Sequence, residues 1–203
     1  MSVHTAKLIL ASASPRRRQL LAERGYEFDV CPPVVDDEPR LADGEGPREL
    51  VCRLARQKAA DVARRLHEGV ILACDTVVDC DGRILGKPAD AADAGAMLRA
   101  LSGREHRVIS GVCLWPLPEG TLSLADAETV LRMDRLSEQE IDAYVASGAW
   151  QGKAGGFGYQ DQLGWVHIIH GSPSNVVGLP MELVEAMLTQ YNIRPRWTSV
   201  SSK

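Results

Sequence analysis

Hydrophobic residues follow two different spacings along the chain, and these predict its strands and helices. Residues 7–10 are typical of a short buried strand, residues 28–31 predict a second short strand, and the mostly apolar run at residues 69–79 is the strongest strand signal in the chain. Apolar residues at helical spacing over residues 47–66 predict an amphipathic helix. Lys58 interrupts the apolar stripe of that helix, because it stands four residues from both Leu54 and Val62.

Capping residues mark the ends of several helices. Ser14 as N-cap and Pro15 at the first helical position predict a helix over residues 15–24, which Gly25 ends. Ser137 and Glu140 form a capping box for a helix within residues 136–148. The other predicted elements are a hairpin turning at residues 81–82, a helix over residues 90–101, strands at 106–114, 128–133 and 165–169, a glycine-rich loop at 153–158 and a last helix from residue 180.

These elements predict an α/β fold with a mixed sheet flanked by helices, because strands and helices alternate and one hairpin adds an antiparallel pair. The 203 residues suffice for a sizeable core in one domain. We expect the ordered core to span about residues 6–194, since the tail after Arg194 carries few apolar residues.

Composition excludes several function classes. The net charge of -4 argues against binding to a nucleic-acid polymer, so any anion site has to be local. The chain has no apolar stretch near the ~20 residues of a membrane span and no long apolar signal segment, which predicts a cytoplasmic protein without membrane contact. The five cysteines are scattered and predict reduced, mostly structural thiols.

The segment at residues 12–18, SASPRRR, is a candidate phosphate site. A helix N-terminus offers unpaired backbone N–H groups, and Ser12, Ser14, Arg16 and Arg17 add donors suited to phosphate oxygens. A capped helix with a solvated basic face explains the same segment equally well. Arg18 lies a further 100° around the helix, so we expect it to point elsewhere.

Two sets of carboxylates could hold a cation or a proton. Asp75 follows the apolar run of a strand, where an unpaired carboxylate is rare, and this favours a functional role over a turn. Asp36, Asp37 and Glu38 are hard oxygen ligands of the kind that Mg²⁺ or Mn²⁺ takes. Taken alone, that acidic cluster is more typical of a solvated loop.

Two lysines and a glutamine complete the candidates. Lys58 on its apolar stripe and Lys87 between Gly86 and Pro88 would help to neutralise a triphosphate, although a snorkelling and a solvated lysine are the plain alternatives. Gln160 follows the glycine-rich loop and can both donate to and accept from a base edge. His167 and His170 fall in a strand, which sends them to opposite faces and argues against a metal site.

Several short blocks together resemble the Maf family of nucleoside triphosphate pyrophosphatases. They occur in the expected order from about residue 8 to residue 188, and their number makes a chance match improbable. The blocks are ASASPRR at residues 11–17, VDD at 35–37, RLARQKA at 53–59, DTVV at 75–78, GKP at 86–88, LSG at 101–103 followed by His106, KAGGFG at 153–158 and VVGLP at 176–180.

The resemblance implies a single Maf-like domain over residues 1–203, with two lobes, a central cleft and a fold like that of inosine triphosphate pyrophosphatases. It implies hydrolysis of a nucleoside triphosphate to the monophosphate and pyrophosphate with a divalent cation, Mg²⁺ or Mn²⁺, and an enzyme that forms a homodimer. In this sequence Asp75 matches the family's proton acceptor, Asp36 its acidic partner and second metal ligand, and Lys58 and Lys87 its phosphate-side lysines.

Within the family, the resemblance is greatest to the branch that acts on dTTP and UTP. Arg16, Thr76 and Gln160 match that branch at the places where the 7-methyl-GTP branch differs, which makes them the expected specificity residues. The chain departs from the branch at residues 158–161, GYQD, where the branch reads Gly-Ile-Gln-Gly. A pyrophosphatase for modified purine nucleotides, such as 7-methyl-GTP, and a non-catalytic nucleotide-binding regulator of cell division remain the alternatives.

Overall fold

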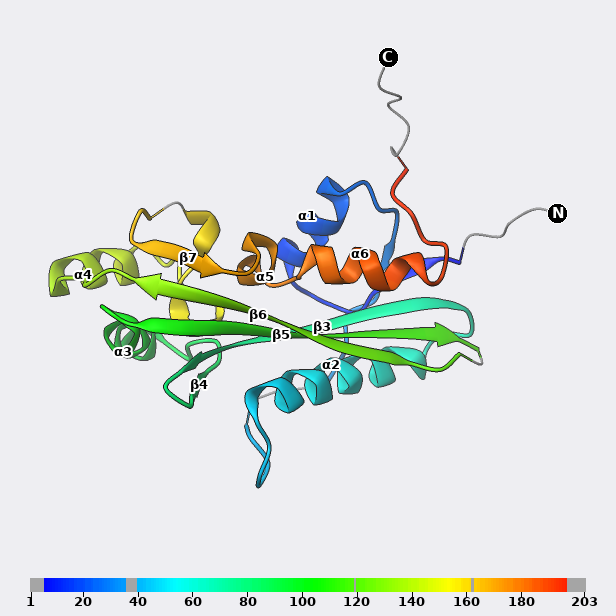
Figure 1. Cartoon of the computed structure of the whole chain (residues 1–203), viewed down its shortest axis with the longest axis horizontal. Coiled ribbons are helices and arrows are strands. Elements are labelled where there is room, and N and C mark those ends of the chain that lie inside the picture. Colours follow the sequence, from blue (N-terminus) through cyan, green and yellow to red (C-terminus); the bar gives the residue numbers. More distant parts are fainter. Residues whose placement is uncertain (1–5, 36–39, 119, 162, 197–203) are drawn as a thin grey trace, which may run out of the picture.

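A seven-stranded mixed sheet forms the centre of the computed structural model, which describes residues 6–35, 40–118, 120–161 and 163–196 (Figure 1). The strands follow the order β2-β1-β3-β5-β6-β7, and β4 also pairs with β3. β1 is parallel to β2 and β3, whereas the other pairs are antiparallel. The bounds are β1 (Leu8–Leu10), β2 (Asp29–Val30), β3 (Gly69–Cys80), β4 (Arg83–Leu85), β5 (Glu105–Leu117), β6 (Ser123–Met133) and β7 (Val166–His170).

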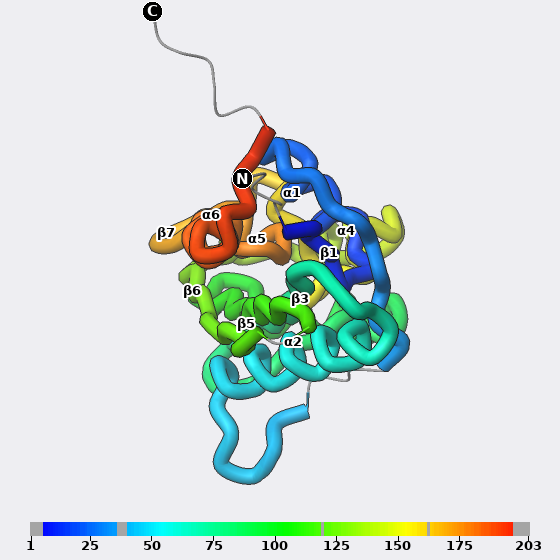
Figure 2. Tube along the Cα trace, turned by 90° about the vertical axis from the view of Figure 1, so that its right-hand side faces the viewer, coloured from blue at the N-terminus to red at the C-terminus, as the bar shows by residue number. Residues whose placement is uncertain are grey.

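Helices cover both faces of this sheet. Figures 1 and 2 show α2 on one face of β3 and β5, with α5 and α6 on the other. The predicted mixed sheet flanked by helices is therefore confirmed. The helices are α1 (Pro15–Glu23), α2 (Pro47–Ala63), α3 (Ala91–Leu101), α4 (Glu138–Ala146), α5 (Pro173–Val177) and α6 (Met181–Thr189), and two 3-10 turns are η1 (Ala154–Gly156) and η2 (Tyr159–Asp161).

Strand β3 is buried on both faces, which explains its nearly continuous apolar sequence. Ile71 and Ala73 belong to the apolar cluster that includes Ala59 of α2. Leu72 and Cys74 belong to the cluster on the opposite face. Because successive side chains of a strand point to opposite faces, Asp75 shares the α2 face with Ala73, and Thr76 points to the other side.

A glycine lets α2 lie close to the sheet at the position of Asp75. Gly111 of β5 is the register partner of Asp75. A Cβ atom at Gly111 would come within 2.4 Å of the backbone carbonyl group of Val51 in α2. This close approach brings the face of α2 that carries Lys58 over the middle of β3.

The sheet has a gap beside the middle of β3. One edge of β3 pairs with β5 throughout residues 69–79. On the other edge, β1 pairs with residues 70–72 and β4 with residues 78–80. Among the described residues, no strand covers that edge at residues 73–77, so side chains on both faces of β3 reach the same opening there.

The structure also corrects some element boundaries. Short helix α5 occupies a stretch before residue 180 for which the sequence predicted no element, and Gly178, with φ of 120°, ends it in the left-handed conformation. β5 continues to Leu117 instead of ending at residue 114, because its pairing with β3 extends through Leu117. No helix of the described chain has the length and apolarity that a membrane crossing requires. The single two-lobed domain stays a prediction.

Candidate active site

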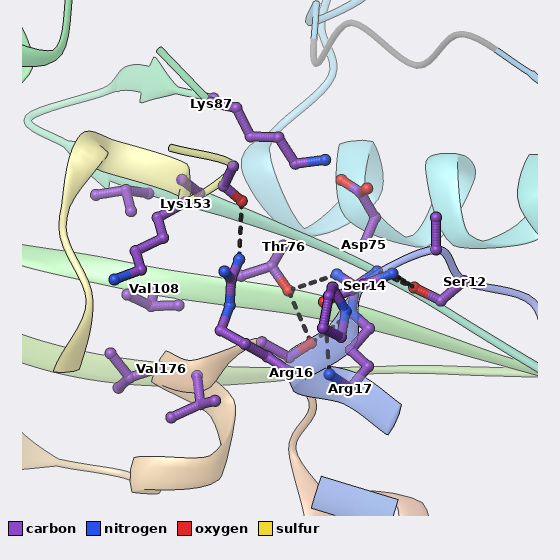
Figure 3. A pocket seen from close by; sticks show the side chains of 18 of the residues that line it. Ser12, Ser14, Arg16, Arg17, Asp75, Thr76, Lys87, Val108, Lys153 and Val176 are labelled. Carbon is purple, nitrogen blue, oxygen red and sulfur yellow. Dashed lines mark hydrogen bonds between the residues drawn. The ribbon is translucent and has the colours of Figure 1, made fainter. Parts of the chain in front are cut away.

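A cavity of about 660 Å³ lies at the gap beside β3 (Figure 3). Its volume falls within the range of small-molecule sites in proteins. Except for Asp36, which lies outside the described residues, all of the predicted site residues line it: Ser12, Ser14, Arg16, Arg17, Lys58, Asp75, Thr76, Lys87 and Gln160.

Asp75 and Lys58 form an ion pair on the α2 side of the cavity. Lys58 Nζ donates to Asp75 Oδ1, and the two side chains are 14% and 12% exposed. A carboxylate this poorly exposed needs a partner, and Lys58 supplies it. The lysine that interrupts the apolar stripe of α2 is therefore directed at the site, which rules out simple snorkelling to solvent.

Arg17 holds the opposite wall of the cavity together. Its Nε donates to the Gly178 carbonyl oxygen at 2.7 Å, its Nη2 to Thr76 Oγ1 at 3.2 Å and its Nη1 to Ser12 Oγ at 3.4 Å (Figure 3). Thr76 Oγ1 lies 2.8 Å from the buried Ser110 Oγ. One guanidinium group thus connects the loop before α1, strand β3 and the end of α5.

The three consecutive arginines of α1 take three different directions. Arg16 Nη2 donates to the Gly152 carbonyl oxygen at 2.8 Å. Burial and the neighbouring charge of Arg17 lower the pKa of Arg16. Arg18 is exposed and does not line the cavity, as its place on the helix predicts. Ser14 caps the helix, accepting from the Arg17 backbone N–H at 3.4 Å.

Lys87 adds a further cation beside Lys58 and Arg17. Its pKa is lowered by partial burial in the cavity and by the charges of Lys58 and Arg17. The loop that carries it is fixed by Gly155, whose N–H donates to the Gly86 carbonyl oxygen at 2.9 Å. Positive charges that lower the pKa of Lys87 favour a polyanionic ligand, which relieves the repulsion between them.

The described cavity lining is strongly cationic. It contains Arg16, Arg17, Lys58, Lys87 and Lys153 against one carboxylate, Asp75. We call the part formed by Ser12, Arg17, Lys58, Asp75 and Lys87 the carboxylate end. This end has the charge and the donors for phosphate groups.

The other end of the cavity is lined mainly by apolar side chains. We call the part formed by Val108, Lys153, Phe157 and Val176 the apolar end. Figure 3 shows Lys153, Val108 and Val176 on the side away from Asp75 and Ser12. Gln160 lines the cavity as well but is exposed. Apolar walls with a few polar groups are typical of a pocket for a base or another flat ring.

The residues of the carboxylate end fit a divalent cation bound together with substrate. Mg²⁺ is commonly held by one or two carboxylates, with water and substrate phosphates as the other ligands. Asp75 offers one such carboxylate, on the condition that Lys58 yields part of its contact. The described residues contain no group of three or more His, Cys, Asp and Glu side chains that could hold a metal alone. His167 and His170 are exposed on β7, away from the cavity lining.

Sequence reasoning missed two parts of the site. The Gly178 carbonyl oxygen accepts from Arg17, from Thr76 Oγ1 at 3.3 Å and from Cys74 Sγ at 3.5 Å. Lys153 was part of a glycine-rich block but not a candidate, and its side chain enters the apolar end. For the Gly178 carbonyl, the available signal in the sequence was the glycine itself, since a left-handed glycine often ends a helix.

Comparisons with known proteins show which family the chain matches. Residues 7–191 match the family described as Maf-like protein. A relative from Rhodopirellula baltica named dTTP/UTP pyrophosphatase is 47% identical over 94% of this chain and 84% of its own length. One of the same name from Sphingopyxis alaskensis is 47% identical over 92% of this chain and 97% of its own. A nucleoside-triphosphatase / dITP/XTP pyrophosphatase structure from Mycobacterium abscessus is 17% identical, with 92% and 95% coverage and a TM-score of 0.43.

Proposed function

The chain belongs to the Maf-like protein family, and from this premise we propose that it hydrolyses dTTP and UTP to the monophosphate and pyrophosphate. The relatives named dTTP/UTP pyrophosphatase support this substrate class. Arg16, Thr76 and Gln160, which mark that branch in the sequence, all line the same cavity.

One observation carries the proposal: in the described lining, a poorly exposed carboxylate, Asp75, lies among cations at one end of a nucleotide-sized cavity. Binding alone would require the cations and the apolar walls. A carboxylate at the phosphate end would weaken anion binding by repulsion, unless it takes part in the chemistry. Asp75 therefore favours a hydrolase over a non-catalytic nucleotide-binding regulator.

The residues suggest a division of labour in the reaction. Asp75 accepts a proton from a water molecule as its oxygen attacks the α-phosphorus. The bond between that phosphorus and the bridging oxygen to the β-phosphate then breaks, and pyrophosphate leaves. Arg16, Arg17, Lys58 and Lys87 stabilise the charge that develops on the leaving group, and the support for this role is that all four line the cavity.

We propose Asp75, with Asp36, as the ligands of a divalent cation, Mg²⁺ or Mn²⁺. Such an ion neutralises phosphate charge and lowers the pKa of a bound water. Lys58 holds the Asp75 carboxylate in place before the substrate arrives. A cytoplasmic location remains a prediction from composition, and a homodimer remains one from the family resemblance.

The proposed function is tested by product analysis with purified protein. We expect dTTP and UTP to yield pyrophosphate, and not orthophosphate, as the first product in the presence of Mg²⁺ or Mn²⁺. CTP, 7-methyl-GTP and ITP complete the panel. Preference for 7-methyl-GTP or ITP would instead identify a pyrophosphatase for modified purine nucleotides, and no release from any nucleotide would favour the regulator.

A further inference from the structure

An ion pair at the apolar end of the cavity is not explained by phosphate chemistry. Lys153 Nζ donates to Asp161 Oδ1 at 2.6 Å and to Asp161 Oδ2 as well. The Lys153 side chain is 11% exposed and that of Asp161 is 19% exposed. Figure 3 shows Lys153 directed toward Val108 and Val176, on the side away from Asp75. A phosphate bound near Asp75 therefore gives no reason for this lysine.

The surrounding structure fixes the carboxylate of this pair. The buried Tyr144 hydroxyl of α4 donates to Asp161 Oδ2 at 2.7 Å. Burial and the bond to Asp161 raise the pKa of Tyr144, so the hydroxyl keeps its proton and stays a donor. A Cβ atom at Gly158 would lie 2.5 Å from Lys153 Nζ and 2.6 Å from Asp161 Oδ2, so a side chain at position 158 would displace the pair from this geometry.

The Lys153 ammonium group retains one donor for a ligand. It has three N–H bonds, and the contacts with the two Asp161 oxygens use two of them. Within the described part of the chain, the side chain has no other hydrogen-bond partner. The remaining N–H belongs to a side chain that lines the cavity. Lysine has no acceptor, so the ligand atom that it meets has to be an acceptor.

We propose that Lys153 is a specificity residue that donates to the 4-oxo group of a uracil or thymine base, and that Asp161 and Tyr144 are its positioning residues. This inference rests on the proposed function, which places the triphosphate at the carboxylate end. Position 4 of a pyrimidine lies across the ring from the nitrogen that carries the sugar. It is therefore the ring atom that reaches farthest toward the apolar end.

The chemistry of position 4 separates the pyrimidines. Uracil and thymine carry a carbonyl oxygen there, which accepts from Lys153. Cytosine carries an amino group, which would set one donor against another and leave both unpaired. Gln160 cannot make this distinction alone, since its amide both donates and accepts and its side chain is exposed. Lys153, restrained by Asp161, offers only a donor.

The test measures binding of non-hydrolysable α,β-imido analogues of UTP and CTP by titration calorimetry. In Lys153→Met we expect the UTP analogue to bind about 10- to 100-fold more weakly, as for the loss of a charged hydrogen bond. The CTP analogue should change by less than about threefold. An unchanged ratio between the affinities for the UTP and CTP analogues, whether both weaken equally or neither weakens, would overturn the proposal.

Three further variants test whether the change in selectivity comes from lost recognition, from misfolding or from a displaced Lys153. Lys153→Met combined with Asp161→Asn removes both charges, so that no poorly exposed carboxylate is left without its partner. It should show the same loss of selectivity. Asp161→Asn alone should reduce the ratio by about threefold to tenfold, with no additional effect once Lys153 is absent. Asp142→Asn, an exposed carboxylate on the same helix as Tyr144, is the matched control and should leave the ratio unchanged.

These measurements also separate the inference from the proposed function. Selective binding that depends on Lys153, without release of pyrophosphate from dTTP or UTP, would refute hydrolysis but support the role of Lys153. Pyrophosphate release, together with a UTP-to-CTP affinity ratio that does not change in Lys153→Met, would support hydrolysis but refute the role of Lys153. Failure of both analogues to bind the unmodified protein would overturn both.

Discussion

The two ends of the cavity handle charge in different ways. Among the described residues of the carboxylate end, Arg17, Lys58 and Lys87 lie around one carboxylate, Asp75, so positive charge is in excess there. At the apolar end, Lys153 is matched by the Asp161 behind it. Excess positive charge attracts a polyanion, and this attraction weakens as the salt concentration rises. A matched ion pair instead fixes the direction of one hydrogen-bond donor. The first end is suited to holding phosphates and the second to distinguishing bases.

The largest expected effect comes from removing the carboxylate of the carboxylate end. Asp75→Asn keeps the shape and a hydrogen-bond acceptor for Lys58 but cannot take up a proton from water. We expect pyrophosphate release from dTTP to fall by about 1,000-fold or more, since general-base catalysis and cation binding are both impaired. Thermal unfolding should show a folded protein. A variant that retains full turnover would contradict the role of Asp75.

The next effect distinguishes neighbouring arginines on α1. Arg17→Lys removes the fork that donates to Gly178, Thr76 and Ser12, and lysine cannot reproduce it. We expect kcat/KM for dTTP to fall by about 100-fold.

Arg18→Lys is the matched control, one residue further along the same helix. Its side chain is exposed and outside the cavity lining, so activity should be unchanged. Similar losses in Arg17→Lys and Arg18→Lys would mean that a general basic face, and not the fork, holds the anion.

A smaller effect concerns the pH dependence of the carboxylate end. The pKa of Lys87 is lowered by partial burial and by Lys58 and Arg17. The ammonium group is charged below its pKa, so its charge is lost as the pH rises and at a lower pH than for an ordinary lysine. We expect kcat/KM to fall by about tenfold at alkaline pH, because Lys87 loses its charge there.

Lys87→Arg tests this assignment, because arginine stays charged in that pH range. The alkaline limb of the profile should move to higher pH in the variant, even if its activity at neutral pH is reduced. A limb at the same pH in both proteins would show that another group controls it.

Local signals in the sequence singled out several residues that the structure brings to one cavity. Two charged residues interrupt apolar patterns: Asp75 follows an apolar run and Lys58 lies on an apolar stripe. Ser14 before Pro15 completes the pattern of a helix N-terminus. All three line the cavity. Such signals need only a few neighbouring residues, and the physics behind them is local: burial of charge and capping of a helix.

The remaining features depend on contacts between distant segments. The Gly178 carbonyl oxygen accepts from Arg17, which lies 161 positions away in the sequence. Every residue has a backbone carbonyl, so the residue type at position 178 does not indicate this contact. The gap beside β3 arises because β1 ends before β4 begins, which the sequence of β3 does not record. Helix α5 has five residues, too few for a helical period to be recognised.

A buried histidine, His106, packs behind the apolar end of the cavity. His106 of β5 is 3% exposed, and its ring packs edge-on against Phe157, which lines the apolar end, with centroids 5.4 Å apart. Neither ring nitrogen has a hydrogen-bond partner among the described residues. Burial lowers the pKa of His106 to about 4, so the folded protein keeps the ring neutral.

The smallest expected effect follows from this pKa through the balance between folded and unfolded states. In the unfolded chain a histidine takes up a proton below about pH 6.5, whereas His106 in the folded protein does so only near pH 4. Acid therefore favours unfolding, and His106 should cost about 1 kcal/mol of stability between pH 7 and pH 5.5. Urea unfolding at these two pH values, compared with His106→Leu, measures this share, because the variant lacks the group and keeps all others. An identical loss of stability in both proteins would mean that His106 takes up its proton as easily in the folded state as in the unfolded one, and the apolar end would then tolerate a charge behind Phe157.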